Sequence, residues 1–269
     1  MKPNCLEVDS LTFDSLQKIF NDEICVLVVR GFASNEVSKK LHNFLVNQKV
    51  SEYTHEIRDK DKIELLYFGV NRYGFPLNNT YDDESGEKYE TYINSALGTM
   101  KSIRKAASPF LSPIDQLRVE LDEIWPYHAN VSVINGRKAL CGIARIMPHE
   151  LSHLSADQPH YDLVSLDYFP TLKRQYAGNL YLQVPEEGGE LEIWDVKPIK
   201  VDQVKSFSVP KDWRAELPKS FKIKPEQGDL LIFNTCRPHA VTSFKSGFPR
   251  TSLQTFIGLD QDDSVCMWN

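Results

Sequence analysis

The spacing of apolar residues changes near position 128 of this chain. Upstream, Leu11, Phe13, Leu16, Ile19 and Phe20 recur at helical intervals, which predicts a helix within residues 11–20. The continuous apolar run CVLVVRG at 25–31 is typical of a buried strand. The first part of the chain is therefore predicted to be helical with some strand.

Two more helices are indicated by their capping residues. Ser34 is a candidate N-cap for a helix with Val37, Leu41, Phe44 and Leu45 on one side. Ser112 and Pro113 suit the start of a helix through IDQLRVELDEIW at 114–125. Between these helices, GFPLNNTYDDESGEKYE at 74–90 predicts polar loops.

From residue 128 the pattern becomes one of short β-branched and aromatic runs separated by turn residues. HANVSVI and KALCGIARIM flank Asn135-Gly136, a pair that favours a β-hairpin. Further strand candidates are GNLYLQV, GELEIWD, SFKIKP, DLLIFNT, AVTSFK and TSLQTFIGL. Strands at this spacing predict a sandwich or barrel. We expect one domain: a mixed region at 1–127 packed on a β core at 128–269, with an insertion near 196–220 at the mouth.

Composition narrows the class of protein. The 269 residues, 41% of them hydrophobic, suffice for one large core. A net charge of −6 disfavours a nucleic-acid partner, and no apolar run approaches membrane-spanning length. The five cysteines form no C-x-x-C pair, and the acidic N-terminus lacks the apolar core of a signal peptide. These features predict a soluble, cytoplasmic protein and leave its oligomeric state open.

The candidate chemistry begins at His160 and Asp162. Alternate residues of an extended strand face the same side, so these two side chains can reach one metal ion. Among the seven histidines, this is the one followed two positions later by an acid. An H-x-D motif alone is weak, because a chain of this composition contains about one by chance.

The downstream sequence strengthens the case. EQGDLLIFNTCRPHAV places His239 after a predicted strand, 77 positions beyond Asp162, and Arg250 follows eleven positions later. Two imidazoles and a carboxylate on one face of iron(II) leave positions open for a chelating co-substrate and dioxygen. Arg250 can pair bidentately with the far carboxylate of a dicarboxylic acid, and Ser252 can add a hydroxyl contact.

Over most of residues 128–260 the chain resembles the iron(II)/2-oxoglutarate-dependent oxygenase superfamily. The resemblance implies a double-stranded β-helix core, jelly-roll and cupin-like, mainly β with flanking helices. It also implies iron(II), 2-oxoglutarate and dioxygen as cofactors, with His160, Asp162 and His239 on the metal and Arg250 on the co-substrate. The segment VPEEGGELEIWD is most similar to freestanding halogenases and hydroxylases of amino acids or alkaloids. Because those halogenases replace the metal carboxylate with Gly, Asp162 indicates hydroxylation.

Other residues are candidates for ligand contacts. Asn179 and Tyr181 share a strand face and are expected to reach the co-substrate. Arg145, in an apolar strand, needs either a ligand anion or a protein carboxylate. Three further substrate contacts are predicted near the rim: His153, Gln158 and Trp268. For His153 the alternative is a solvated loop residue, and for Trp268 a cap on the core.

The predicted function is hydroxylation of an unactivated C–H bond in a small polar molecule. A free amino acid is the first choice, and within that class a lysine-like one. A protein or peptide hydroxylase is an alternative, which predicts an open groove; the 1–127 region and the 196–220 insertion favour a lid instead. A barrel that binds metal or ligand without turnover is the alternative from a different class.

Overall fold

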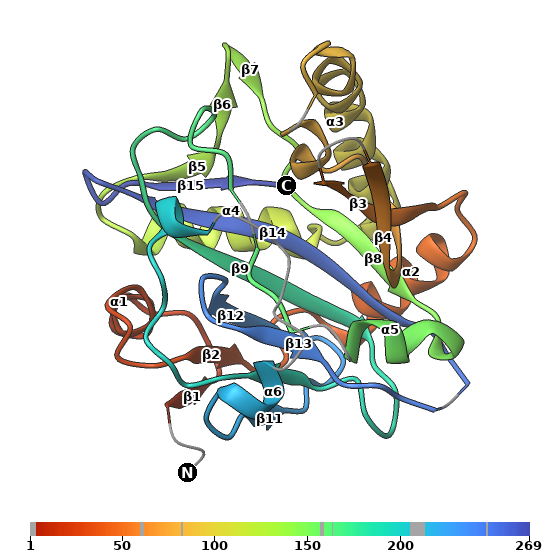
Figure 1. The fold of residues 1–269 in the computed structure, drawn as a ribbon. Helices are drawn as coiled ribbons and strands as arrows, with labels where there is room; N and C mark the ends of the chain where they lie inside the picture. Colours follow the sequence, from red (N-terminus) through yellow and green to blue (C-terminus); the bar gives the residue numbers. More distant parts are fainter. Residues whose placement is uncertain are drawn as a thin grey trace.

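The computed structural model describes residues 4–59, 62–81, 83–156, 159–162, 164–204, 213–245 and 247–269. Its fold is mainly β with flanking helices, as predicted, and most of its strands belong to two sheets (Figure 1). Ten strands form the large sheet, and three form a small sheet.

In the large sheet, neighbouring strands often come from distant parts of the sequence. Its order is β1 (Cys5–Val8), β2 (Val26–Val29), β12 (Leu230–Asn234), β9 (Leu172–Gln183), β14 (Arg250–Asp260), β8 (Ile143–Met147), β4 (Lys62–Tyr73), β3 (Ser51–Asp59). β15 (Val265–Trp268) pairs with both β14 and β5 (Ala129–Val131). The small sheet has the order β11 (Phe221–Ile223), β10 (Leu191–Ile193), β13 (His239–Val241).

The first 127 residues contribute strands to this sheet as well as helices. β2 pairs antiparallel with β12, and β4 pairs antiparallel with β8. Backbone hydrogen bonds thus join the predicted N-terminal region to the predicted core on both sides of β9 and β14. The predicted boundary between a region at 1–127 and a core at 128–269 stays a prediction.

The helices begin where the capping residues predict. The Ser34 hydroxyl accepts from the Val37 amide at the start of α2 (Asn35–Val46), and the Ser112 hydroxyl accepts from the Asp115 amide at α4 (Pro113–Ile124). Thr12 caps α1 (Phe13–Phe20). α2 contacts β9 and β8, and α4 contacts β14, so these helices cover the outer face of the large sheet. The inner face is left for the small sheet and the site.

Three segments of the chain differ from the sequence prediction. The segment expected as polar loops contains a 3-10 turn (Leu77–Thr80) and the start of α3 (Glu87–Ala107). β3 and β4 form an unpredicted antiparallel pair, and the C-terminal residues form β15. The predicted Asn135-Gly136 hairpin is confirmed, joining β6 (Val133–Ile134) to β7 (Arg137–Lys138), with φ of 49° and 77° at the turn.

The remaining short elements lie around the sheets. They are a 3-10 turn (His149–Leu151), α5 (Ser152–Ala156), a second 3-10 turn (Val201–Gln203) and α6 (Trp213–Glu216). The last two belong to the predicted 196–220 insertion, of which residues 205–212 lie outside the described part of the chain. No helix among the described residues is long and apolar enough to cross a membrane.

Candidate metal centre and cavity

Three side chains predicted from sequence converge at one point between the two sheets. His160 and His239 face each other across an antiparallel bridge, with backbone hydrogen bonds of 2.9 and 3.0 Å. Next to this bridge, the Asp162 amide donates a hydrogen bond to the Thr235 carbonyl at 3.1 Å. One potential ligand atom from each of the three side chains lies within 4.8 Å of the others. A single metal ion can therefore be bound by two imidazoles and one carboxylate.

The groups around the Asp162 carboxylate favour its ionised form. Its oxygens lie 3.5 Å from His239 Nε2 and 4.0 Å from His160 Nε2. Burial alone would raise the pKa of Asp162, but His239, His160 and Arg145 together hold this pKa below its usual range. The carboxylate is consequently ionised at neutral pH, the state in which it binds metal.

Backbone contacts fix the orientation of His239. Its Nδ1 lies 2.9 Å from the Arg237 carbonyl, which can only accept a hydrogen bond. Nδ1 therefore carries the proton in the neutral ring, and Nε2, the atom near Asp162, keeps its lone pair for a metal.

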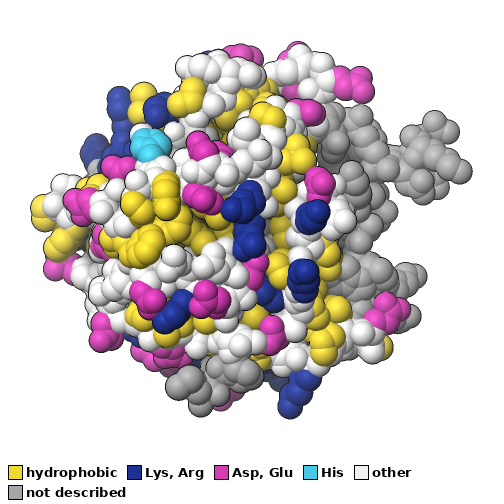
Figure 2. All heavy atoms as spheres, turned by 90° about the vertical axis from the view of Figure 1, so that its left-hand side faces the viewer, with side chains coloured by type: hydrophobic (Ala, Val, Ile, Leu, Met, Phe, Trp, Pro, Cys, Tyr) yellow, Lys and Arg dark blue, Asp and Glu magenta, His cyan; other side chains and the backbone are white. Residues whose placement is uncertain are grey.

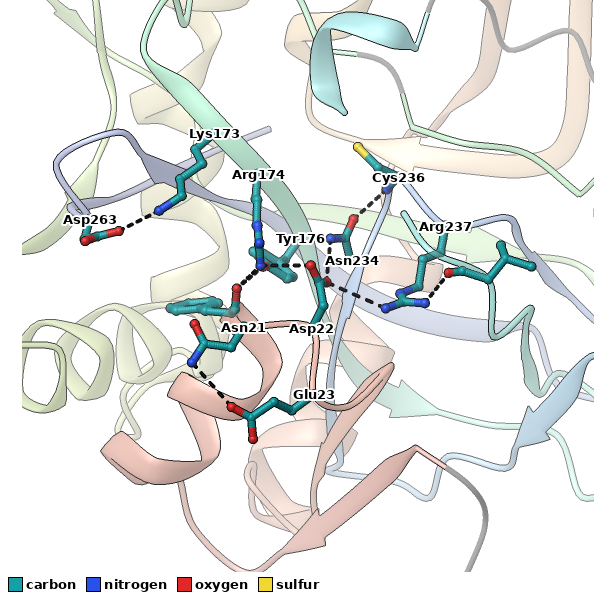
Figure 3. Close-up of polar contacts among 12 residues, drawn as sticks. Asn21, Asp22, Glu23, Lys173, Arg174, Tyr176, Asn234, Cys236, Arg237 and Asp263 are labelled. Carbon is teal, nitrogen blue, oxygen red and sulfur yellow. Dashed lines mark hydrogen bonds and ion pairs between the residues drawn. The ribbon is translucent and has the colours of Figure 1, made fainter. Parts of the chain in front are cut away.

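The turn that carries His239 is tied to the N-terminal region by charged side chains (Figure 3). Asp22 pairs with Arg174 at 2.8 Å and lies 3.7 Å from Arg237, a side chain only 5% exposed. Asn234 donates to the same Asp22 carboxylate at 3.1 Å and accepts from the Cys236 amide at 2.9 Å. The loop after α1 thus helps to hold the segment between β12 and β13.

Asp162 is held from the other side by a buried glutamine. Gln175, fully buried on β9, donates its amide to the Thr235 hydroxyl at 2.8 Å and to the Asp162 carbonyl at 3.4 Å. Gln175 is not among the residues predicted from the sequence. A buried polar residue in a strand was its signal, of the same kind that drew attention to Arg145.

Arg250, Ser252, Asn179 and Tyr181 line the cavity that contains the triad. In the register of the large sheet Ser252 pairs with Tyr181 and Gln254 with Asn179. The Arg250 guanidinium lies over the Tyr181 ring, 4.8 Å from its centre. The predicted co-substrate residues therefore share one floor, to which the structure adds Gln254, the next inward position of β14.

Several buried polar atoms of the cavity lining have no hydrogen-bond partner among the described residues. They are Arg145 Nε, Arg250 Nε, Asn179 Oδ1, the Tyr181 hydroxyl and Gln254 Nε2. Burial lowers the pKa of the Arg250 guanidinium and raises that of the Tyr181 hydroxyl. Buried polar groups normally have partners, so this cluster fits a polar, anionic ligand.

Arg145 also lines the cavity, from β8. Of the two environments predicted for it, the described residues contain no carboxylate paired with its guanidinium. The group instead lies over the Tyr53 ring, 5.2 Å from the ring centre. Tyr53, from β3, is a cavity residue that the sequence analysis missed.

Two of the predicted substrate contacts do not line the described cavity, and a third is not among the described residues. His153 is exposed on α5 and does not line it, and Gln158 lies outside the described residues. Trp268 is fully buried against Phe169, at 4.1 Å between ring centres, and pairs with Phe256 in the sheet. Phe256 is six residues from Arg250 along β14, about 20 Å away. Trp268 is a core residue, and the prediction of a substrate contact is corrected.

Residues 149–258, which contain the triad and Arg250, match the sequence profile of the 2OG-Fe(II) oxygenase superfamily. An L-isoleucine 3(1)-dioxygenase of Pantoea ananatis is 25% identical over 267 residues, covering 90% of this chain and 82% of that protein.

Two solved structures share the arrangement of the whole chain. An N-substituted L-amino acid dioxygenase of Burkholderia ambifaria AMMD has a TM-score of 0.62 at 16% identity, covering 96% of this chain and 92% of its own. A structure of that protein with alpha-KG has a TM-score of 0.58 at 16% identity, covering 96% and 91%. This likeness confirms the predicted double-stranded β-helix core.

Proposed function

This chain belongs to the 2OG-Fe(II) oxygenase superfamily, and from that membership we propose that it hydroxylates an unactivated C–H bond of a free amino acid. Its cofactors are iron(II) and 2-oxoglutarate, with dioxygen as co-substrate. The proposal assigns the iron to His160, Asp162 and His239 and the distal carboxylate of 2-oxoglutarate to Arg250.

The convergence of the triad beside an unpaired buried arginine is the observation that supports the proposal most. The three ligand atoms lie within 4.8 Å of one another, and the Arg250 side chain lines the same cavity. The donor set, two imidazoles and one carboxylate, is that of non-haem iron(II) oxygenases. The residues present therefore fit the metal and the co-substrate.

The reaction divides between the cofactors and the chain. Bound iron, with dioxygen and 2-oxoglutarate, supplies the oxidation of the C–H bond, releasing succinate and carbon dioxide. The chain holds the ionised Asp162 carboxylate and the Nε2 lone pair of His239 in place. Arg250, Ser252 and Tyr181 orient the dicarboxylate, and the apolar lining limits water at the site.

The lining of the cavity favours an aliphatic amino acid. Val70, Met147, Leu191, Phe233 and Val241 supply apolar walls. Asp162 is the one acid among the described lining residues, and the proposal uses it for the metal. A lysine-like side chain would bury an ammonium group without a carboxylate, so we replace the lysine-like prediction with an aliphatic one. The name of the Pantoea relative, an L-isoleucine dioxygenase, supports this choice.

The enclosed cavity favours a small-molecule substrate over a peptide. Tyr53, Met147, Tyr181, His239 and Arg250 are all buried in a cavity between two sheets, which suits a small molecule better than a peptide lying in a groove.

On the face drawn in Figure 2, acidic and basic side chains are interspersed, so this face offers no continuous basic surface to nucleic-acid phosphates. The five cysteines are free, which agrees with a reducing cytoplasm.

Substrate-stimulated succinate formation tests the proposed function. The purified chain with iron(II) and 2-oxoglutarate is presented with each free amino acid, and product mass distinguishes added oxygen from lost hydrogen. We expect stimulation by aliphatic amino acids and a product one oxygen atom heavier. A chain that binds metal but forms no succinate with any amino acid would be a binding barrel, and stimulation by peptides alone would indicate a peptide hydroxylase.

A further inference from the structure

Two guanidinium groups lie in the cavity, and the proposed function uses only one of them. Arg250 lies over the Tyr181 ring and Arg145 over the Tyr53 ring, at 4.8 and 5.2 Å from the ring centres. Neither is paired with a carboxylate of the described residues, and the Nε atom of each is buried without a hydrogen-bond partner. Arg250 is buried and Arg145 is half-buried, and a guanidinium withdrawn from water without an ion-pair partner is costly. Arg145 therefore requires an explanation of its own.

The two arginines lie over rings from two different apolar clusters, which define two halves of the cavity lining, although Arg250 is also the register partner of Met147. Arg250 adjoins an apolar cluster that lines the cavity through Ala177, Tyr181, Leu191 and Phe233. The lining contributed by a separate cluster, on the Arg145 side, consists of Tyr53, Val70, Met147 and Val241. Ser252 separates the two sides, because it pairs with Tyr181 on β9 and with Arg145 on β8. Each half thus combines one guanidinium, one tyrosine ring and an apolar wall.

β4, the strand next to β8, carries a second positively charged side chain, Arg72. Arg72 on β4 is the register partner of Arg145, and like charges directly opposite in a sheet are unfavourable. The Arg72 guanidinium turns away, donating to the Gly74 carbonyl at 2.6 Å and lying over the Phe75 ring at 5.0 Å. It does not line the described cavity. Arg145 is left as the cation that faces the cavity on this side.

We propose that Arg145 binds the carboxylate of the amino-acid substrate, whose aliphatic side chain lies against Val70, Met147 and Val241. The proposal rests on the proposed function for the other half of the cavity, where Arg250 takes the co-substrate. A guanidinium over an aromatic ring presents a fork of N–H donors that matches a carboxylate. The enzyme then selects its substrate by two features, an α-carboxylate and an apolar side chain.

The test compares acids with their amides in wild type and variants. The probes are L-isoleucine, L-leucine and L-valine and their carboxamides, which keep the side chain and amine but lose the carboxylate. One readout is the KM for each probe in succinate formation. The second is the rise in melting temperature caused by each probe, measured with manganese(II) and 2-oxoglutarate bound, which needs no turnover.

In wild type we expect the acids, and not the amides, to stimulate succinate formation and to raise the melting temperature. Arg145→Gln should raise the KM for the acid at least about 30-fold and abolish its stabilising effect. Its KM for 2-oxoglutarate should change less than about threefold. Arg145→Lys, which keeps the charge without the fork, should fall between the two.

Arg72→Gln is the matched control, because it removes the neighbouring charge outside the described cavity lining. We expect it to change the KM for the acid less than about threefold. The proposal is overturned if Arg72→Gln matches Arg145→Gln, if Arg145→Gln keeps the wild-type response, or if the amides act as well as the acids. It is also overturned if none of the acids stabilises the wild-type chain.

Failure of the proposed function has a different signature. It would show as wild-type protein that forms no succinate with any amino acid, whatever the melting temperatures. Failure of the Arg145 assignment would show in the variants and in the acid–amide comparison, while wild-type turnover persists. Circular dichroism of Arg145→Gln, with Arg145→Lys as the milder change, guards against loss of fold as the cause.

Discussion

Arg250 is buried on β14. Asp162, the one acid among the described residues that line the cavity, is assigned to the metal, so the charge of Arg250 is left for a ligand. Arg250→Gln should therefore raise the KM for 2-oxoglutarate by about 30- to 150-fold, since it removes a charged, bidentate contact. Ser252→Ala removes one neutral hydroxyl and should raise that KM by about tenfold or less. Steady-state kinetics with varied 2-oxoglutarate checks both values. An unchanged KM in Arg250→Gln would remove this arginine from the co-substrate site.

Strand alternation explains which site residues could be predicted. Arg250 with Ser252 on β14, and Asn179 with Tyr181 on β9, are each two positions apart, so one face of a strand presents both members. His160 and Asp162 have the same spacing on a segment that joins His239 through a single β-bridge. Gln254 lines the cavity two positions beyond Ser252, so the same alternation could have predicted it.

Residues that reach their positions through pairing between distant strands could not be predicted from this alternation. Tyr53 reaches the cavity because β3 pairs with β4 and β4 with β8, a path that no local pattern reveals. Trp268 was placed at the mouth because it is near the chain end. The pairing of β15 with β14 and β5 puts it in the core instead.

At the scale of elements, the loop after α1 holds the turn that carries His239. Asp22 has a positive φ of 58°, a conformation that Asn also tolerates, so Asp22→Asn removes charge with little backbone strain. The variant loses ion pairs with Arg174 and Arg237. We expect affinity for iron(II) to fall by about tenfold, measured by competition with a chelator, because outer contacts orient metal ligands.

Asp263→Asn is the control for this change. Asp263 pairs with Lys173 at 3.0 Å in the same region, but both side chains are nearly half exposed. Such pairs contribute little, so metal affinity should stay at the wild-type value. Equal effects of the two variants would argue against a specific role of Asp22.

Helices α3 and α4 are joined by a charge pair with a defined pH dependence. Arg104 contacts Asp115 at 2.6 Å, and Arg118 contacts it at 2.8 Å. Burial tends to raise the pKa of Asp115, but Arg104, Ser112 and Arg118 outweigh this and lower it. The stabilisation is therefore present above the ordinary pKa of aspartate, about 3.9, and is lost as pH falls through the lowered value.

Asp115→Asn should lower the free energy of unfolding by about 1–3 kcal/mol at pH 7. The difference from wild type should narrow as pH falls below about 4. Urea denaturation at several pH values measures both. Asp122→Asn, at an exposed position of the same helix, serves as the control. A difference that is independent of pH would rule out the charge pair as its cause.

Elements with a clear apolar stripe and a side-chain cap were predictable, and the others were not. α3 follows Gly86, an N-cap residue that has a φ of 75° and offers no side chain for capping. Its buried positions include two alanines, Ala96 and Ala107, while Leu97 is 53% exposed, so its faces contrast weakly. The β3–β4 segment HEIRDKDKIEL is mostly charged, which hides its strand character from an apolar pattern.

For the whole molecule, the cavity joins both halves of the chain. Tyr53 and Val70 come from the N-terminal half, and the triad, Arg145 and Arg250 come from the other. A fragment of residues 128–269 would expose the edges of β8 and β12 that β4 and β2 cover. We expect this fragment to lack a cooperative urea transition, in contrast to the full chain. A fragment that unfolds cooperatively and binds iron would show that the core is independent.

The measurement that tests the central claim most directly is iron(II) bound per chain, determined by anaerobic equilibrium dialysis. The account predicts about one ion per wild-type chain and an affinity at least about 100-fold lower in Asp162→Ala. His149→Ala, which removes a histidine outside the described cavity lining, should bind like wild type. Undiminished iron binding by Asp162→Ala would contradict the assignment of His160, Asp162 and His239 as one metal site.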